Sequence, residues 1–240
     1  MIDLHNHVLP GVDDGAYDLE MALRMLDIAA GQGITHVACT PHGHDRMNEE
    51  TDRLYQSVFL ELQKAVEELG IPVQLALGTE IMLGVELLRV LHLPCATYHG
   101  AGKYFLLEFP IETPFEIILN VTTTAHRANR RPVLAHFERF ARAMRTKEYV
   151  KKIREAGAVI SLDAGSLVGQ FGAVIEKRAR QLLEWDVVDL LASDAHNDAV
   201  HGFRLKEGYD AAVKILGEEK ALKLVNDHPR RVWEGLPWTT

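Results

Sequence analysis

Short apolar runs with many β-branched residues alternate with amphipathic stretches along most of the chain. Seven of these runs are predicted to be strands, at residues 2–4, 34–40, 72–77, 104–109, 132–135, 158–162 and 187–192. Several are largely apolar, which is typical of parallel strands that are covered on both faces. The alternation of strand and helix predicts repeated βα units around a parallel sheet or barrel.

Helices are predicted between the runs, where apolar residues recur at helical spacing. Residues 49–69 follow Asn48, a suitable cap, and stop at Gly70. Thr113 followed by Pro114 predicts another helix start, with proline at the first helical position. The remaining helices are predicted at residues 18–30, 147–156, 172–184, 203–216 and 218–225.

The composition is that of one ordinary globular domain. Hydrophobic residues make up 47% of the 240 residues and charged residues 25%, which excludes general disorder. No repeat, low-complexity tract or long linker interrupts the pattern, so residues 1–240 are predicted to form a single domain, a size that α/β barrels commonly reach. The formal charge of -8 argues against a protein that holds nucleic acid on a basic surface.

Neither a targeting signal nor thiol chemistry is expected. The first residues lack the basic and apolar regions of a secretion signal, and no apolar run approaches the roughly 18 to 20 residues of a spanning helix. We therefore expect a cytoplasmic protein without membrane insertion. Cys39 and Cys95 form no metal-type pair or disulfide framework. A thiol phosphatase nucleophile at Cys39 would need an arginine at position 45, which is Asp45.

Ligand-type side chains follow six of the seven predicted strands. His5 and His7 flank Asn6, and because alternate residues of a strand share a face, their imidazoles are expected on one side. Barrel enzymes gather their functional groups at the carboxyl ends of the strands. The candidates at this rim are His5, His7, Asp14, His42, Glu80, Glu108, His136, Asp194 and His196.

Any one of these nine residues has a simpler explanation as a hydrogen-bonded core or surface group. Nine together do not, because an inward-facing carboxylate or imidazole destabilises the fold unless it is paired or bound to a metal. The chain has twelve histidines and a net negative charge, which also favours metal binding, since imidazole is the commonest metal ligand. Nine ligands exceed the needs of one ion, so two or three ions are predicted.

In their order, these residues resemble the metal motifs of the polymerase and histidinol phosphatase (PHP) superfamily. The closer resemblance is to the bacterial capsule-associated, metal-dependent protein tyrosine phosphatases within it. Four segments carry it: MIDLHNHVLPGVDDGA at residues 1–16, and residues 135–139, 164–172 and 192–197. The resemblance extends from Met1 to about Trp233 and is most specific in the opening segment.

The resemblance implies a distorted seven-stranded (β/α) TIM-like barrel of the PHP type that holds three divalent ions in an open cleft. The implied ligands are His5, His7, Glu80 and Asp194 for the first ion; Glu80, Glu108 and His136 for the second; and Asp14, His42 and His196 for the third. Manganese is the expected metal, and the mixed ligands also suit iron or zinc, with magnesium as a further alternative.

The resemblance also implies how phosphate is held. Arg139 matches an arginine of the family that grips phosphate, and Arg204 is the expected counterpart of a second one, with His201 as a helper in the same loop. The expected reaction is direct attack on phosphorus by a hydroxide that bridges two ions, without a covalent enzyme intermediate. The arginines would neutralise the nonbridging oxygens. The donor of the leaving-group proton stays open.

The implied substrate is a tyrosine-phosphorylated protein or peptide, with the tail of a tyrosine kinase of exopolysaccharide or capsule synthesis as the expected partner. Two alternatives remain: a PHP phosphatase for a small molecule such as histidinol phosphate, and a noncatalytic regulator of a capsule-assembly kinase. The opening segment and residues 165–172 favour the tyrosine phosphatase, and the intact ligand set argues against lost activity. An exonuclease is disfavoured by the acidic balance and by the lack of a basic, aromatic strand-binding stretch.

Overall fold

The computed structural model describes residues 1–239, in which the strand pairs are all parallel. A three-stranded sheet has the order β1 (Ile2–Asp3), β2 (His36–Cys39) and β4 (Gln74–Leu77). A six-stranded sheet has the order β3 (His42–His44), β5 (Glu80–Met82), β6 (Tyr104–Glu108), β7 (Arg131–Leu134), β8 (Val159–Asp163) and β9 (Leu190–Ala192). The order along the chain is thus the order across each sheet.

Each of the seven predicted runs contains a strand, but the described residues form nine strands. The second and third runs are each followed by a further short strand after a break, at Pro41 before β3 and at Gly78 before β5. Pairing continues across the breaks, because the Gly78 amide donates to the Cys39 carbonyl (2.9 Å) and the Glu80 amide donates to the Pro41 carbonyl (3.0 Å). The extra strands therefore follow directly on the predicted ones. Proline has no amide proton for the ladder, which accounts for the break at Pro41 before β3.

The chain segments after the first and last strands are hydrogen-bonded to each other. The Asp194 amide donates to the His5 carbonyl, and the His7 amide donates to the Ala195 carbonyl, each at 2.8 Å. Asn6 and Ala195 form an isolated parallel bridge. Residues nearly two hundred positions apart are thereby brought to one edge of the strands.

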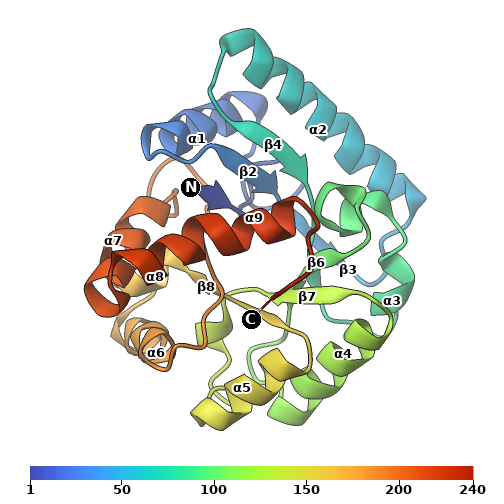
Figure 1. Cartoon of the computed structure of the whole chain (residues 1–240). Coiled ribbons are helices and arrows are strands. Elements are labelled where there is room, and N and C mark those ends of the chain that lie inside the picture. Colours follow the sequence, from blue (N-terminus) through green and yellow to red (C-terminus); the bar gives the residue numbers. More distant parts are fainter. Residues whose placement is uncertain (240) are drawn as a thin grey trace.

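Helices surround the strands (Figure 1). They are α1 (Leu19–Gly31), α2 (Glu49–Leu69), α3 (Leu87–Val90), α4 (Phe115–Arg127), α5 (Lys147–Glu155), α6 (Ala173–Glu184), α7 (Leu205–Leu216), α8 (Glu218–Leu222) and α9 (His228–Trp233). The predicted helix at 49–69 is confirmed, with the Asn48 side chain as its N-cap and Gly70 in the left-handed region at φ 67°. Pro114 is the residue before α4 rather than its first residue. The helix predicted at 218–225 divides, because a π-helical turn, Lys223–Asp227, separates α8 from α9.

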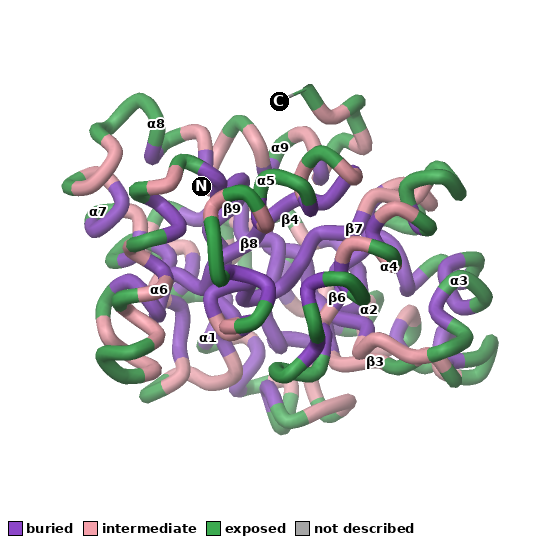
Figure 2. Tube along the Cα trace, turned by 90° about the horizontal axis from the view of Figure 1, so that it is seen from below, coloured by how far each residue is buried: buried purple, intermediate pink, exposed green. Residues whose placement is uncertain are grey.

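The C-terminal segment covers the amino ends of the strands, where α9 crosses them (Figure 1). Val232 of α9 packs in one buried apolar cluster with Ile2, Leu106 and Leu190. The Tyr104 hydroxyl, at the start of β6, donates to the Leu236 carbonyl at 2.6 Å. This end of the strands is therefore closed by apolar packing, and the buried trace lies at the centre of the molecule (Figure 2).

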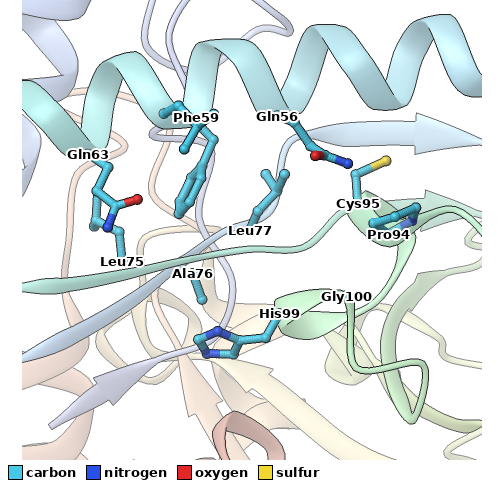
Figure 3. A pocket seen from close by; sticks show the side chains of 11 residues that line it. Gln56, Phe59, Gln63, Leu75, Ala76, Leu77, Pro94, Cys95, His99 and Gly100 are labelled. Carbon is cyan, nitrogen blue, oxygen red and sulfur yellow. The ribbon is translucent and has the colours of Figure 1, made fainter.

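A cavity of about 410 Å³ lies between α2 and β4 (Figure 3). Phe59 of α2 points toward the strand, and Cys95 and His99 lie at the other side of the cavity. None of the nine predicted ligand residues lines it. The predicted chemistry therefore belongs to the carboxyl ends of the strands and not to this cavity.

Candidate metal centre

The predicted ligands lie where strands end. Glu80 follows the end of β4 and is the first residue of the short strand β5, and Glu108 is the last residue of β6. His136 comes after β7 and Asp194 after β9, and both have positive φ, 32° and 51°. Non-glycine residues rarely adopt such a backbone, and when they do they cluster at functional sites. At both positions the chain turns sharply as the strand ends and directs a ligand-type side chain to the rim.

Four buried side chains form the first group. His5 Nε2 lies 3.1 Å from Glu80 Oε2 and 3.2 Å from Asp194 Oδ1. His7 Nε2 lies 3.2 and 3.3 Å from the same two oxygens, and 3.3 Å from His5 Nε2. One ligand atom from each of the four lies within 4.8 Å of all the others. This is the set that the resemblance implied for the first ion.

The second group shares Glu80 with the first. His136 Nε2 lies 3.0 Å from Glu80 Oε1 and 3.3 Å from Glu108 Oε1. The two oxygens of Glu80 thus face different partners, Oε2 the first group and Oε1 the second. This carboxylate could therefore contribute one oxygen to each group.

The third group is the most exposed of the three. The Nε2 atoms of His42 and His196 lie 3.5 and 3.6 Å from Asp14 Oδ1. His7 completes a set of four whose ligand atoms lie within 4.8 Å of one another. The Asp14 side chain is 69% exposed, so this group is reached directly from solvent.

The donor atoms fit divalent cations. Glu80 Oε2 is buried and meets nitrogens of His5, His7 and His42 at 3.1–3.2 Å, yet it has no hydrogen-bond partner among the described atoms. The Nδ1 atom of His7 lies 2.8 Å from Asp13 Oδ2, so the Nε2 lone pair is turned toward the group. Converging imidazole and carboxylate lone pairs are a donor set for manganese, iron or zinc.

The electrostatics keep the two central carboxylates ionised. Burial acts to raise the pKa of Glu80, but the surrounding imidazoles, with His5 foremost, hold that pKa well below its ordinary value. Burial likewise acts to raise the pKa of Asp194, and His5 and His7 hold it well below the ordinary value. Both carboxylates are therefore ionised at neutral pH and available to a cation.

Arg139 borders the first group. Its Nη2 atom lies 2.6 Å from Asp163 Oδ2 and 2.9 Å from Asp194 Oδ2, and its guanidinium carbon lies 4.7 Å from the centre of the Phe171 ring. Arg204 is placed differently. Its ion pair in the described structure is with Glu207, at 2.8 Å, and it precedes α7. The structure therefore brings the nine predicted ligands and Arg139 together. Arg204 is also partly buried, with a buried Nε atom that has no partner among the described atoms, but its charge is paired with Glu207.

Residues 1–234 match the family described as capsular polysaccharide synthesis, CpsB/CapC. The chain belongs to this family. It is 27% identical over 237 residues to the tyrosine-protein phosphatase CpsB of Streptococcus pneumoniae, covering 97% of this chain and 98% of that one. It is 29% identical over 219 residues to the tyrosine-protein phosphatase YwqE of Bacillus subtilis, covering 91% and 86% of the two chains.

Solved structures agree with the family assignment. A structure from work on YwqE of Bacillus subtilis and CpsB of Streptococcus pneumoniae, described as unique metal-dependent tyrosine phosphatases, superposes with a TM-score of 0.88. It is 26% identical and covers 100% of this chain and 96% of its own. An amidohydrolase from Mycoplasma synoviae has a TM-score of 0.60 at 13% identity, with 97% and 87% covered, and shows a shared fold. The CpsB/CapC chain thus has the α/β architecture of amidohydrolase-type enzymes.

Two acidic residues of this CpsB/CapC site were missed in the sequence. Asp13 accepts from the His42 amide (2.9 Å) besides contacting His7, so it organises two ligands at once. The sequence feature that could have identified Asp13 is its position next to the candidate Asp14 in the same turn. Asp163 ends β8 and binds Arg139. The predicted strand at residues 158–162 was the only one to which no ligand-type residue was assigned. Asp163 lies at its carboxyl end, as the nine candidates lie at the ends of the other six predicted strands.

Gly15 permits the close approach of this turn to the first strand. A Cβ atom there would lie 1.9 Å from the His7 carbonyl oxygen and 2.4 Å from the His7 Cβ atom. The Ala16 amide donates to the same carbonyl at 2.9 Å. The glycine of the opening segment is therefore needed because the backbone packs directly on His7.

Thiol chemistry has no place in this site. Cys39 is buried, and burial raises its pKa to about 12. A thiol is nucleophilic only as the thiolate, so Cys39 is inert near neutral pH.

Through residue 239, the structure contains no helix with the length and apolar character to cross a membrane.

Proposed function

We propose that this chain is a metal-dependent phosphatase that hydrolyses phosphotyrosine on proteins. The observation that carries the proposal is the convergence of nine imidazole and carboxylate side chains beside one half-buried arginine, in a chain of the CpsB/CapC family. The CpsB and YwqE relatives, which it matches over most of their length, are named tyrosine-protein phosphatases.

The strands are proposed to form a distorted, seven-stranded barrel of the PHP type. The continued pairing across the breaks after β2 and β4 supports counting each interrupted pair as one strand. The hydrogen bonds between the segments after β1 and β9 support closure between the first and last strands. A barrel of this kind presents its strand ends as one rim, where the ligands lie.

Three divalent ions are proposed, with manganese as the expected metal. His5, His7, Glu80 and Asp194 would hold the first; Glu80, Glu108 and His136 the second; and Asp14, His42 and His196 the third. When bound, such ions supply Lewis acidity to the phosphoryl group and lower the pKa of a coordinated water toward neutrality. Asp13 orients His7, and Glu80 is the shared ligand.

Arg139 is proposed to bind the nonbridging oxygens of the substrate phosphate. Its guanidinium is held by Asp163 and by the face of Phe171, which leaves its other nitrogens to meet an anion. Charge-assisted hydrogen bonds of this kind are strongest where water is excluded. Arg204, the expected second arginine, would have to leave Glu207 to contribute.

The proposed substrate is a tyrosine-phosphorylated segment, such as the tail of a capsule or exopolysaccharide kinase in the cytoplasm. The exposure of Asp14 supports an opening that admits a side chain carried on a polypeptide. A phosphatase for a small molecule such as histidinol phosphate uses the same metals, and the relatives' names favour protein substrates. The intact ligand set disfavours a purely regulatory protein.

Kinetics on two substrates test the proposal. The manganese-loaded protein should hydrolyse a phosphotyrosine peptide with a higher kcat/KM than histidinol phosphate, and activity should vanish with excess chelator and return with Mn²⁺. Preference for histidinol phosphate would replace the proposed substrate class. Full activity in excess chelator would overturn the metal mechanism, and no hydrolysis of any phosphomonoester would favour the regulatory alternative.

A further inference from the structure

The loop between Asp194 and Arg204 brings His201, expected from the sequence only as a helper of Arg204, into the site itself. His201 Nε2 lies 3.9 Å from Asp194 Oδ2, beyond hydrogen-bonding distance. The same nitrogen is buried and has no partner among the described atoms. A buried donor without a partner costs free energy, so a ligand that accepts its hydrogen bond gains from it.

The loop backbone is built to hold His201 in place. The amides of His196 and Asn197 both donate to the His201 carbonyl, at 2.7 and 3.1 Å. The His201 amide in turn donates to the Asn197 side-chain oxygen at 2.9 Å. The imidazole ring stacks on His196, with 4.3 Å between centroids and 11° between planes. His201 is therefore anchored on both its backbone and its ring.

Phe171 contacts both His201 and Arg139. The Phe171 ring packs edge-on against His201, with centroids 5.4 Å apart, and carries the Arg139 guanidinium 4.7 Å from its centre. Both polar groups face the same oxygen, Asp194 Oδ2. The other oxygen, Oδ1, faces His5 and His7. Oδ1 of Asp194 thus faces the proposed metal ligands, and Oδ2 faces the nitrogen donors of Arg139 and His201.

We propose that His201 donates the second hydrogen bond to the substrate phosphate, beside Arg139 and in place of Arg204. This inference rests on the proposed phosphatase function. A phosphate oxygen that meets the His201 Nε2–H group and the Arg139 guanidinium would be held by two donors on one wall. Arg204 lies three residues further on. Its Nη1 atom is paired with Glu207, while its buried Nε atom has no partner among the described atoms, so Arg204 is the rival donor that the test must include.

A metal ion is the competing occupant of His201, since Asp194, His196 and His201 could also form a ligand set. The position of Arg139 argues against it. Its guanidinium already lies 2.9 Å from Asp194 Oδ2, the oxygen that faces His201. A divalent cation there would meet a fixed positive charge at close range, whereas an anion is attracted by it.

Paired substitutions test the inference in the manganese-loaded full chain. His201→Leu removes the donor, and His201→Gln keeps an N–H group at a similar reach. Affinity for inorganic phosphate is measured by calorimetry, and metal content is measured by mass spectrometry. We expect His201→Leu to weaken phosphate binding about tenfold or more with its metal content unchanged, and His201→Gln to restore part of the affinity. KM for an aryl phosphate should rise in parallel.

Two neighbours serve as comparisons, Val200→Ala as the exposed control in the same loop and Arg204→Ala as the rival donor. Loss of metal from His201→Leu would overturn the inference in favour of a metal ligand. Unchanged phosphate affinity in His201→Leu, or a loss confined to Arg204→Ala, would overturn it as well, as would a wild-type chain that binds no phosphate. Phosphate binding that depends on His201 in a chain without hydrolytic activity would refute the proposed function alone.

Discussion

At the scale of single residues, the proposed metal site depends on which atom of each side chain faces the other ligand residues. Glu80 offers one oxygen to His5 and His7 and the other to His136. His7 offers Nε2 because its Nδ1 atom is occupied by Asp13. A ligand and the residue that orients a ligand should therefore respond differently to substitution.

Replacing His136 by alanine should remove turnover together with part of the bound metal. His136 is the only imidazole proposed for the second ion, and Glu80 alone is shared with another group. We expect kcat/KM to fall by more than the roughly 10- to 100-fold that is typical of outer partners of metal ligands. His92→Ala, an exposed histidine outside the site, should keep both rate and metal. Full metal content in His136→Ala would contradict the assignment.

Replacing Asp13 by asparagine should weaken metal binding although all nine proposed ligand residues are still present. The carboxylate fixes the His7 ring and accepts from the His42 amide, so its loss frees both. A decrease of about 10- to 100-fold in manganese affinity is expected, measured by titration against a competing chelator. Asp27→Asn, an exposed change on α1, is the matched control. Equal affinities in the two variants would show that Asp13 does not orient a ligand.

At the scale of elements, the turns and loops after the strands make the site. The turn after β1 supplies Asp13 and Asp14, and Gly15 lets it pack on His7. The segment after β7 supplies His136 and then Arg139, which reaches the end of β8 at Asp163. Neighbouring strand ends therefore hold one another's functional groups.

Gly15→Ala should damage the metal site through the backbone. The added methyl group would overlap the His7 main chain, so the turn must move and carry Asp13 with it. We expect lower manganese affinity and a lower Tm, by several degrees for a chain of this size. The matched control is Gly31→Ala at the end of α1, where nothing lies within 4 Å of the added atom. Equal metal affinity and Tm in both variants would refute the close approach at Gly15.

Arg139→Ala should separate phosphate binding from metal binding. The guanidinium contacts Asp194 by one oxygen only, so the ligands of the first group stay in place without it. We expect wild-type metal content and a loss of roughly 100- to 1,000-fold in kcat/KM, the effect of removing one donor to a transition-state oxygen. Burial and the nearby Asp194 already raise the pKa of Asp163 well above its ordinary value, so this partner can take up a proton when Arg139 is lost. Normal kinetics would exclude Arg139 from the site.

At the scale of the whole molecule, the acidic balance and the twelve histidines belong together. Four proposed ligands are acidic and five are histidines, and three divalent ions would bring the formal charge from -8 to about -2. The acidic charge therefore describes mainly the metal-free protein. A cleft that holds these ions beside Arg139 attracts an anionic substrate even though the chain as a whole is acidic.

Stability should respond to pH in opposite ways with and without metal. Burial disfavours the charged forms of His7 and His136, but carboxylate hydrogen bonds, led by Asp13 and Glu108 respectively, outweigh it and hold both pKa values well above the ordinary 6.5. In the metal-free protein this stabilisation is complete below about pH 6.5 and is lost as pH rises through the raised pKa values. Metal binds the neutral imidazoles, so its stabilisation grows over the same range.

Calorimetry of the metal-free and manganese-loaded protein from about pH 6.5 to 8.5 measures this difference, because protons and metal compete for the same nitrogens. The gap between the two Tm values should widen as pH rises. A constant gap would mean that the imidazoles of the site do not exchange protons for metal.

The sequence predicted the seven strand positions and the nine ligand residues because both depend on local pattern. Apolar runs mark buried strands, and each strand of a βα unit must end at the same rim, so His5 and Asp194 could be assigned to one site from their positions alone. The extra strands β3 and β5 were not foreseen, since pairing beyond the breaks at Pro41 and Gly78 depends on the neighbouring strand.

Tertiary structure decided which partner each group meets. The sequence predicted phosphate-binding roles for both Arg139 and Arg204, yet Arg139 pairs with Asp163 and Asp194 and lies over Phe171, whereas Arg204 pairs with Glu207. His201 enters the site because the hydrogen bonds of its loop and the ring of His196 turn it inward. The spacing of residues determines which side chains reach the rim, whereas contacts between side chains on different strands depend on packing across the whole fold.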